Sequence, residues 1–182
     1  MEKPTPTIKG IFVRSHLRGL KKAKGKAGLD ELARRYGKPL VFKSLANIPV
    51  AEEIRIIDLI IDILYGGMPA QKRAFEAGRL HFRNFLGTAP AKLLYAESKL
   101  SIKAVFLRAR LVASYVFKGM KFDAEDMGRQ TVKISVRDCA YPLEHFQGFF
   151  QEWLAVLGFV GSVGAEAAEG GVFEYLVEWH QP

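Results

Sequence analysis

Two different hydrophobic periods divide the chain at about residue 113. Before this point, apolar residues recur every three or four positions, which is the spacing of amphipathic helices. After it, apolar residues such as Met120, Phe122 and Ala124 alternate with charged ones, which indicates strands with one exposed face. The pattern predicts an α+β fold, in which an N-terminal helical part is followed by a four-stranded antiparallel sheet arranged as hairpin, helix, hairpin.

Glycine and proline mark the ends of the predicted helices. We expect helices over residues 10–22, 30–36, 50–65, 69–86 and 101–113, and another that begins after Thr88. The glycines at 25 and 28 are expected to end the first helix. Isoleucine and leucine cover almost the whole circumference of 50–65, so this helix is expected at the centre of the core.

The alternating pattern predicts four strands, over 116–126, 129–138, 159–167 and 171–179. A helix over 142–157 carries a broad aromatic stripe and is expected to cross one face of the sheet. We therefore predict a single domain over 1–182, with a helical part over 10–113 and a sheet part over 114–180. Residues 1–9 are polar and contain two prolines, so we expect them to be disordered.

Composition excludes several classes of protein. A chain of 182 residues with 49% hydrophobic and 12% aromatic residues is an ordinary globular domain. Its single cysteine, Cys139, excludes a disulfide scaffold. The N-terminus lacks the apolar core of a signal peptide, and the longest apolar stretch, 54–65, is too short to span a bilayer. We expect a cytoplasmic protein that does not span the membrane.

The net charge of +8 is distributed unevenly, since residues 1–45 carry +9 and residues 138–182 carry −7. A basic N-terminal region could attract nucleic acid, an anionic membrane surface or an acidic protein. No base-stacking motif or recognition helix accompanies it, so we favour a solvated surface. The opposite charges of the two ends could cancel within the fold or draw chains together. The densest basic group, called the basic patch below, comprises Arg14, Arg18, Lys21, Lys22, Lys24 and Lys26.

The C-terminal part carries a recognisable motif, PLEHFQGFFQEWLAVLG over residues 142–158, followed by a hairpin that closes in FEYLVEW over 173–179. Together with Gly10, the Leu86-Gly87 pair and Pro90, it resembles a family of unknown function found largely in myxobacteria. The order of helices, hairpin, helix and hairpin is also similar to a superfold shared by the vinyl-4-reductase sensor domain, the haem nitric-oxide-binding domain and small subunits of the TRAPP complex. The resemblance implies a hydrophobic pocket between the helices and the sheet.

The haem-binding relatives draw attention to His81. Ala74, Gly78, His81 and Phe85 share one face of the predicted helix 69–86, and small residues beside a histidine could admit a flat ligand. The same pattern is explained if a neighbouring helix packs closely over Ala74 and Gly78 and His81 is hydrogen-bonded. We favour this interpretation. The Tyr-x-Ser-x-Arg motif that holds the haem propionates in those relatives has no match. We therefore expect no haem, and no other cofactor.

The sequence contains no motif for metal binding or catalysis. A zinc site needs three or four Cys, His or acidic ligands, and Cys139 with His145 is a pair only. We expect no metal, and a plain buried or loop thiol at Cys139. No nucleophile elbow, phosphate loop or dinucleotide fingerprint is present. No catalytic residue is assigned, and we expect a protein that is not an enzyme.

The sequence thus predicts a binding or regulatory module of bacterial type, which takes a small apolar ligand or another protein, including a second copy of itself. Binding of nucleic acid or an anionic surface through the basic patch is the alternative. A ligand sensor requires an apolar cavity, whereas an interaction module requires a filled core and an exposed apolar patch. The candidate pocket residues are Ala74, Gly78, His81, Phe82, Phe85, Phe106, Phe146, Phe149, Phe150 and Trp153.

Overall fold

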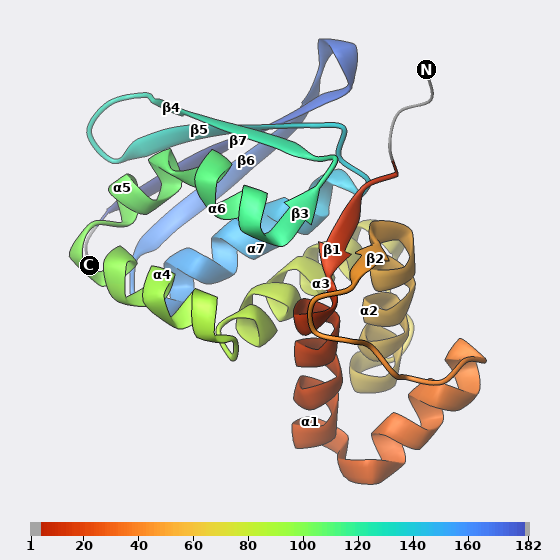
Figure 1. Cartoon of the computed structure of the whole chain (residues 1–182). Coiled ribbons are helices and arrows are strands. Elements are labelled where there is room, and N and C mark those ends of the chain that lie inside the picture. Colours follow the sequence, from red (N-terminus) through yellow and green to blue (C-terminus); the bar gives the residue numbers. More distant parts are fainter. Residues whose placement is uncertain (1–4, 181–182) are drawn as a thin grey trace.

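The computed structural model describes residues 5–180, apart from the side chains of 90, 93, 94 and 98–100. Helices cover one face of an antiparallel sheet, as Figure 1 shows. The helices are α1 (Gly10–Tyr36), α2 (Val50–Tyr65), α3 (Ala70–Phe85), α4 (Ala89–Leu100), α5 (Ile102–Leu107), α6 (Ala109–Val116) and α7 (Leu143–Val156). The strands are β1 (Thr7–Lys9), β2 (Asn47–Pro49), β3 (Phe117–Lys118), β4 (Lys121–Asp126), β5 (Thr131–Arg137), β6 (Val160–Ala168) and β7 (Val172–His180), with the 3₁₀ turn η1 (Glu169–Gly171) between the last two.

The main sheet has the strand order β4-β5-β7-β6, and every neighbouring pair is antiparallel. Val132, Ile134 and Val136 on β5 are fully buried, and they alternate with residues that are partly exposed. Tyr175 and Val177 on β7 continue this inner face. Helix α7 packs against it (Figure 1), so the predicted α+β fold with its hairpin, helix, hairpin order is confirmed.

The predicted strand 116–126 is split in the structure. Its first part, β3, pairs with β1 in a separate small sheet of order β2-β1-β3, whereas β4 pairs with β5. Gly119 lies between the two parts with a φ of 83°, a conformation that glycine adopts without strain. The alternation of apolar residues continues through this turn, so the period alone could not locate the break.

The expected disorder of residues 1–9 is wrong for the described residues 7–9. They form β1, the central strand of the small sheet, and Ile8 is fully buried. Residues 1–4 lie outside the described part of the chain. A three-residue strand is too short to show a period, so only its pairing with β2 and β3 reveals it.

The first helix does not end at the glycines as predicted. Helix α1 continues to Tyr36, and Gly25 changes its direction with a φ of 65° and a ψ of −156°. Figure 1 shows the bend, and the residues after it turn back toward α2, where Leu32 and Tyr36 are buried and Tyr36 donates a hydrogen bond to Glu52. The predicted helix 30–36 is therefore the second arm of α1.

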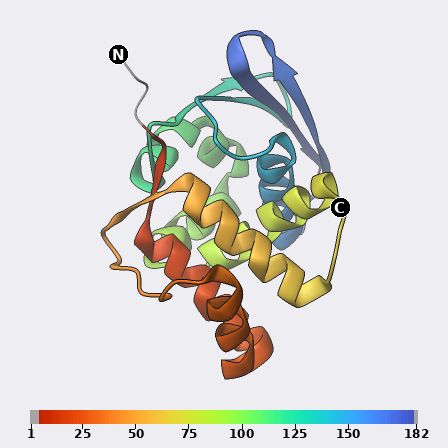
Figure 2. The same ribbon diagram turned by 90° about the vertical axis from the view of Figure 1, so that its right-hand side faces the viewer.

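Helices α2, α3 and α7 follow the predicted ranges closely, while the predicted helix 101–113 is broken at Arg108 into α5 and α6. Figure 2 shows α2 running alongside α1 on the outer side of the helical part. Within residues 5–180, no helix combines the length and the apolar character that crossing a membrane requires.

Candidate functional site

An apolar cavity of about 50 Å³ lies between α5, α6, α7 and the inner face of the sheet. Helix α3 contributes His81 and Phe85 to its wall, and β4 and β5 contribute Phe122 and Ile134. Residues of α5 and α6, such as Val105 and Val116, also line it, although the sequence analysis did not select them. Seven predicted pocket residues meet at this cavity: His81, Phe85, Phe106, Phe146, Phe149, Phe150 and Trp153.

The other three predicted pocket residues lie elsewhere. Phe82 is fully buried and its ring stacks on that of Trp153, with 5.1 Å between the ring centroids. Ala74 and Gly78 are buried on α3, outside the cavity wall. A Cβ on Gly78 would be 1.7 Å from the carbonyl oxygen of His145, so the backbones of α3 and α7 are in direct contact here. The small residue at position 78 thus serves helix packing.

Trp153, one of the lining residues, carries an unpartnered polar atom. Its indole N–H is buried and has no hydrogen-bond partner among the described residues. Its ring packs edge-on against Phe106, at 5.2 Å between centroids. A buried donor without an acceptor costs about 1–3 kcal/mol, so a group that accepts this hydrogen bond would be stabilised here.

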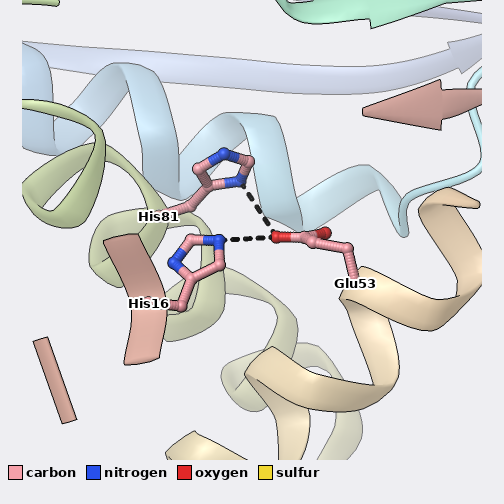
Figure 3. Close-up of side chains that lie close together, drawn as sticks. All are labelled: His16, Glu53 and His81. Atoms are coloured by element: carbon pink, nitrogen blue, oxygen red, sulfur yellow. Dashed lines mark hydrogen bonds and ion pairs between the residues drawn. The ribbon is translucent and has the colours of Figure 1, made fainter. Parts of the chain in front are cut away.

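A buried polar cluster adjoins the cavity, where α1, α2, α3 and α7 meet. It consists of His16, Glu53, His81 and His145, called the His–Glu cluster below. Figure 3 shows the imidazoles of His16 and His81 directed at one carboxylate oxygen of Glu53. His16 Nε2 lies 2.8 Å from Glu53 Oε1, and His81 Nδ1 lies 3.7 Å from the same atom. His81 Nδ1 is also 3.0 Å from His145 Nε2.

Burial governs the protonation of the cluster. It lowers the pKa of His81 well below its usual value and lowers that of His145 to about 4. Burial alone would raise the pKa of Glu53, but the ring N–H groups that His81 and His16 direct at its carboxylate lower this pKa to about 2. At neutral pH, Glu53 is therefore a carboxylate, and His81 and His145 are neutral imidazoles.

The position of the His81 proton follows from its neighbours. A proton on Nδ1 faces the Glu53 carboxylate and can be donated to His145 Nε2, whereas a lone pair on Nδ1 would face the carboxylate unfavourably. The lone pair of His81 then sits on Nε2, which points away from Glu53 in Figure 3. Because His81 also lines the cavity, this one ring connects the cavity with the His–Glu cluster.

Two polar atoms of this region are buried without a partner at hydrogen-bonding distance among the described residues: Glu53 Oε2 and the Tyr141 hydroxyl. Burial raises the pKa of Tyr141 well above its usual value, and the nearby charge of Glu53 raises it further. Asn84 Nδ2 lies 3.2 Å from His16 Nδ1, on the outer side of the cluster.

The sequence analysis missed His16 and Glu53 and paired His145 only with Cys139. The four cluster residues come from four helices, so no local spacing connects them. One signal was present: Glu53 is a charged residue in a helix expected to be apolar all round, and it is fully buried. Cys139 is half-buried, and burial raises its pKa to about 11, as expected of an unreactive thiol.

The basic patch lies on the surface of α1, on both sides of the bend at Gly25. Its six residues are exposed; Arg14 donates to Ser44 and Lys26 pairs with Asp30. Among the described residues, no glutamate of 138–182 forms an ion pair with the patch. Figure 1 shows α1 far from β6 and β7, so the basic patch is not neutralised by direct contact with these two strands.

The fold is similar to that of solved H-NOX structures. One from a study of the molecular mechanism of H-NOX activation has a TM-score of 0.70, with 16% identity over 96% of this chain and 98% of that chain. An oxygen-binding H-NOX domain related to soluble guanylate cyclases has a TM-score of 0.65, with 18% identity over 96% of both chains. An Fe(II) unliganded H-NOX variant from K. algicida has a TM-score of 0.63, with 14% identity over 96% and 97%. At these identities, the likeness establishes the fold alone.

An H-NOX fold implies a haem group, and the residues here do not fit one. Cofactor pockets measure about 300–1,000 Å³, against about 50 Å³ for this cavity. The rings of Phe106, Phe150 and Trp153 fill the space between α5, α7 and the sheet, with Phe106 and Phe150 at 6.0 Å between centroids. His81 keeps a lone pair on Nε2, so the lack of space, and not the state of this histidine, is what does not fit a haem group.

Sequence comparison places the chain in a family. None of the curated proteins matches it. The model of a family described as "Protein of unknown function (DUF2378)" matches residues 3–180, which include every motif that carried the resemblance to a family of unknown function. The chain therefore belongs to the DUF2378 family.

Proposed function

We propose that this domain is a non-enzymatic sensor that binds a small, mostly apolar ligand in the cavity between α5, α6, α7 and the sheet. The observation that carries the proposal is the cavity itself: an apolar space inside an aromatic core, lined by side chains such as Phe106, Val116 and Trp153. Protein cores are normally filled to the density of organic crystals, so an unfilled space of this size is unusual.

The size and chemistry of the cavity define the ligand class. A water molecule occupies about 30 Å³ in the liquid, so about 50 Å³ admits a ligand of only a few heavy atoms. Apolar cavities of this kind stay dry and bind apolar species such as xenon. The almost wholly apolar lining favours a small apolar ligand, such as a diatomic gas. One structure of similar fold is described as an oxygen-binding domain, which agrees with this class.

Helix α6 is the element that would transmit ligand binding. Its Val112 and Val116 line the cavity, whereas its Leu111 and Tyr115 are 55% and 70% exposed. A ligand that displaces the inner side chains would move the outer ones with them, because the helix is rigid over two turns. This arrangement connects a structural change in the cavity with a structural change at the protein surface.

Xenon tests the proposal because it is apolar and fits the cavity. We expect xenon to shift the amide NMR signals of α5, α6 and α7 in the wild-type protein. Val105→Phe should abolish these shifts by filling the cavity, whereas Val41→Phe, at a position that is 82% exposed, should leave them unchanged. Wild-type signals that do not respond, or an equal response in Val105→Phe, would contradict the proposal.

A second candidate function is self-association through α5 and α6. Leu107, Leu111 and Tyr115 are exposed at intervals of four positions, which forms an apolar stripe along this segment. Such a stripe can pack against its own copy in an antiparallel helix pair. Sedimentation at low and high salt tests it: a dimer that persists in high salt and is lost in Leu111→Glu supports it, and a monomer at micromolar concentration contradicts it.

A further inference from the structure

We propose that the His–Glu cluster is a buried binding site for a divalent transition-metal ion, best fitted by Zn²⁺, with His16 Nε2, Glu53 Oε1, His81 Nδ1 and His145 Nε2 as its ligands. The sequence predicted no metal, because Cys139 and His145 form only a pair of neighbouring ligands. This inference concerns a different site from the ligand cavity and does not depend on the proposed function.

The convergence of histidines is the first observation. The chain has four histidines, and three of them meet at one carboxylate although they come from α1, α3 and α7. The fourth, His180, is exposed at the end of β7. Imidazole nitrogens with one carboxylate oxygen are a ligand set that Zn²⁺ takes in proteins.

The distances bring three of the ligand atoms within reach of one ion. Zn²⁺ binds nitrogen and oxygen at about 2.0–2.2 Å, which places neighbouring tetrahedral ligands about 3.3 Å apart. The measured separations are 2.8 Å for His16 Nε2 to Glu53 Oε1, 3.7 Å for His81 Nδ1 to Glu53 Oε1, and 3.0 Å for His81 Nδ1 to His145 Nε2. The potential ligand atoms of His16, Glu53 and His81 all lie within 4.8 Å of one another. His145 is close to His81 but lies outside this group of three, so its side chain would have to move inward to become the fourth ligand.

The carboxylate lacks a cationic partner, which is the second, independent observation. Glu53 is fully buried and, among the described residues, its ion-pair partners are histidines, with no lysine or arginine beside it. Its Oε2 atom has no hydrogen bond of ordinary length, and the nearby Tyr141 hydroxyl that interacts with Glu53 is neutral and does not offset the carboxylate charge. A buried charge is costly unless it is paired or coordinates a metal. A metal ion would compensate the charge of Glu53 at this point.

Metal binding requires a shift of protons within the imidazoles. His16 and His81 would each move a proton from the liganding nitrogen to the other ring nitrogen, so no proton has to leave the protein. The Asn84 amide, which now donates from Nδ2 to His16 Nδ1, would turn to present its oxygen to the new N–H. Asn84 thereby becomes a positioning residue for His16.

All four ligand residues are buried, so the ion must enter while α1, α2, α3 and α7 assemble. The full-length protein should therefore be unfolded and refolded with Zn²⁺ or with a chelator, and its metal content measured by elemental analysis after extensive dialysis. We expect one Zn²⁺ per chain in the first case and a lower melting temperature in the second. X-ray absorption at the zinc edge should show nitrogen and oxygen ligands and no sulfur.

Variants identify the ligands. His81→Gln and Glu53→Gln should lose the metal, while His180→Gln and Cys139→Ser should keep it at one per chain. Asn84→Ala should weaken binding about 10- to 100-fold. If the ligand variants fail to fold, the visible spectrum of wild-type protein refolded with Co²⁺ serves as the test instead. Tetrahedral Co²⁺ has ligand-field bands in the visible range. The proposal would be overturned if the refolded wild-type protein retained no Zn²⁺ and showed no Co²⁺ spectrum. It would also be overturned if the His180→Gln or Cys139→Ser variant lost the metal.

Discussion

The backbone of Gly78 lies so close to the carbonyl oxygen of His145 that a Cβ built on Gly78 would be 1.7 Å from it. Gly148 makes the reciprocal contact on α7, where a Cβ would be 2.0 Å from the carbonyl oxygen of Phe75. The two glycines allow α3 and α7 to cross in backbone contact. This crossing brings His81 within 3.0 Å of His145 and so completes the His–Glu cluster.

Gly78→Ala tests the helix crossing. In an isolated helix this change would stabilise by about 1 kcal/mol through helix propensity. Here the methyl group meets backbone atoms that cannot move alone, so we expect a net loss of about 1–3 kcal/mol in the free energy of unfolding. Gly67→Ala is the control, since nothing lies within 4 Å of a Cβ at Gly67 and its φ is not positive. Equal stability of the two variants in urea denaturation would show that the crossing is looser than described.

Glu152 forms a second contact between α7 and α3. Its carboxylate accepts hydrogen bonds from Arg79 Nε and Arg83 Nε, both at 2.7 Å, and it is almost completely buried. We expect Glu152→Gln to reduce the free energy of unfolding by about 1.5–3 kcal/mol, the range for hydrogen bonds to charged groups. Glu125→Gln removes one partner of a pair with Lys133 in which Glu125 is 64% exposed, and it should have no measurable effect. Similar urea midpoints for both variants would contradict this assignment.

Cys139 should react slowly with alkylating reagents. Burial raises its pKa from 9.0 to about 11, which lowers the thiolate fraction near pH 8 about 100-fold. Because the thiolate is the reactive form, the rate with iodoacetamide should keep rising with pH beyond 9 while circular dichroism shows the fold intact. The same protein unfolded in urea provides the control and should react at the rate of an ordinary cysteine. A plateau near pH 9 in the folded protein would show that the thiol is exposed.

The sequence predicts the parts of this fold that have a long local period. Helices α2, α3 and α7 and the strands β5, β6 and β7 each repeat their apolar positions several times, so their ranges agree with the structure within one or two residues. The small sheet could not be predicted in this way. Strands β1 and β3 have three and two residues, and they exist because of pairing between residues far apart in the chain, such as Ile8 with Phe117.

The candidate site was predictable to a similar, limited degree. The aromatic stripe of α7 and the face of α3 predicted a shared apolar region, and seven of those residues do meet at the cavity. The His–Glu cluster could not be predicted, because His16, Glu53 and His145 are brought together only by the packing of four helices. The bend at Gly25 was also beyond prediction, since a glycine in a helical pattern ends some helices and redirects others.

A crystal structure determined under xenon pressure tests the central claim, that this H-NOX-like fold has a small apolar ligand cavity in place of a haem pocket. The account predicts one xenon atom between α5, α6 and α7, in contact with Phe106 and Trp153, and no haem in the purified protein. A core that admits no xenon at this position, or a haem group bound beside His81 with these aromatic rings displaced, would contradict it.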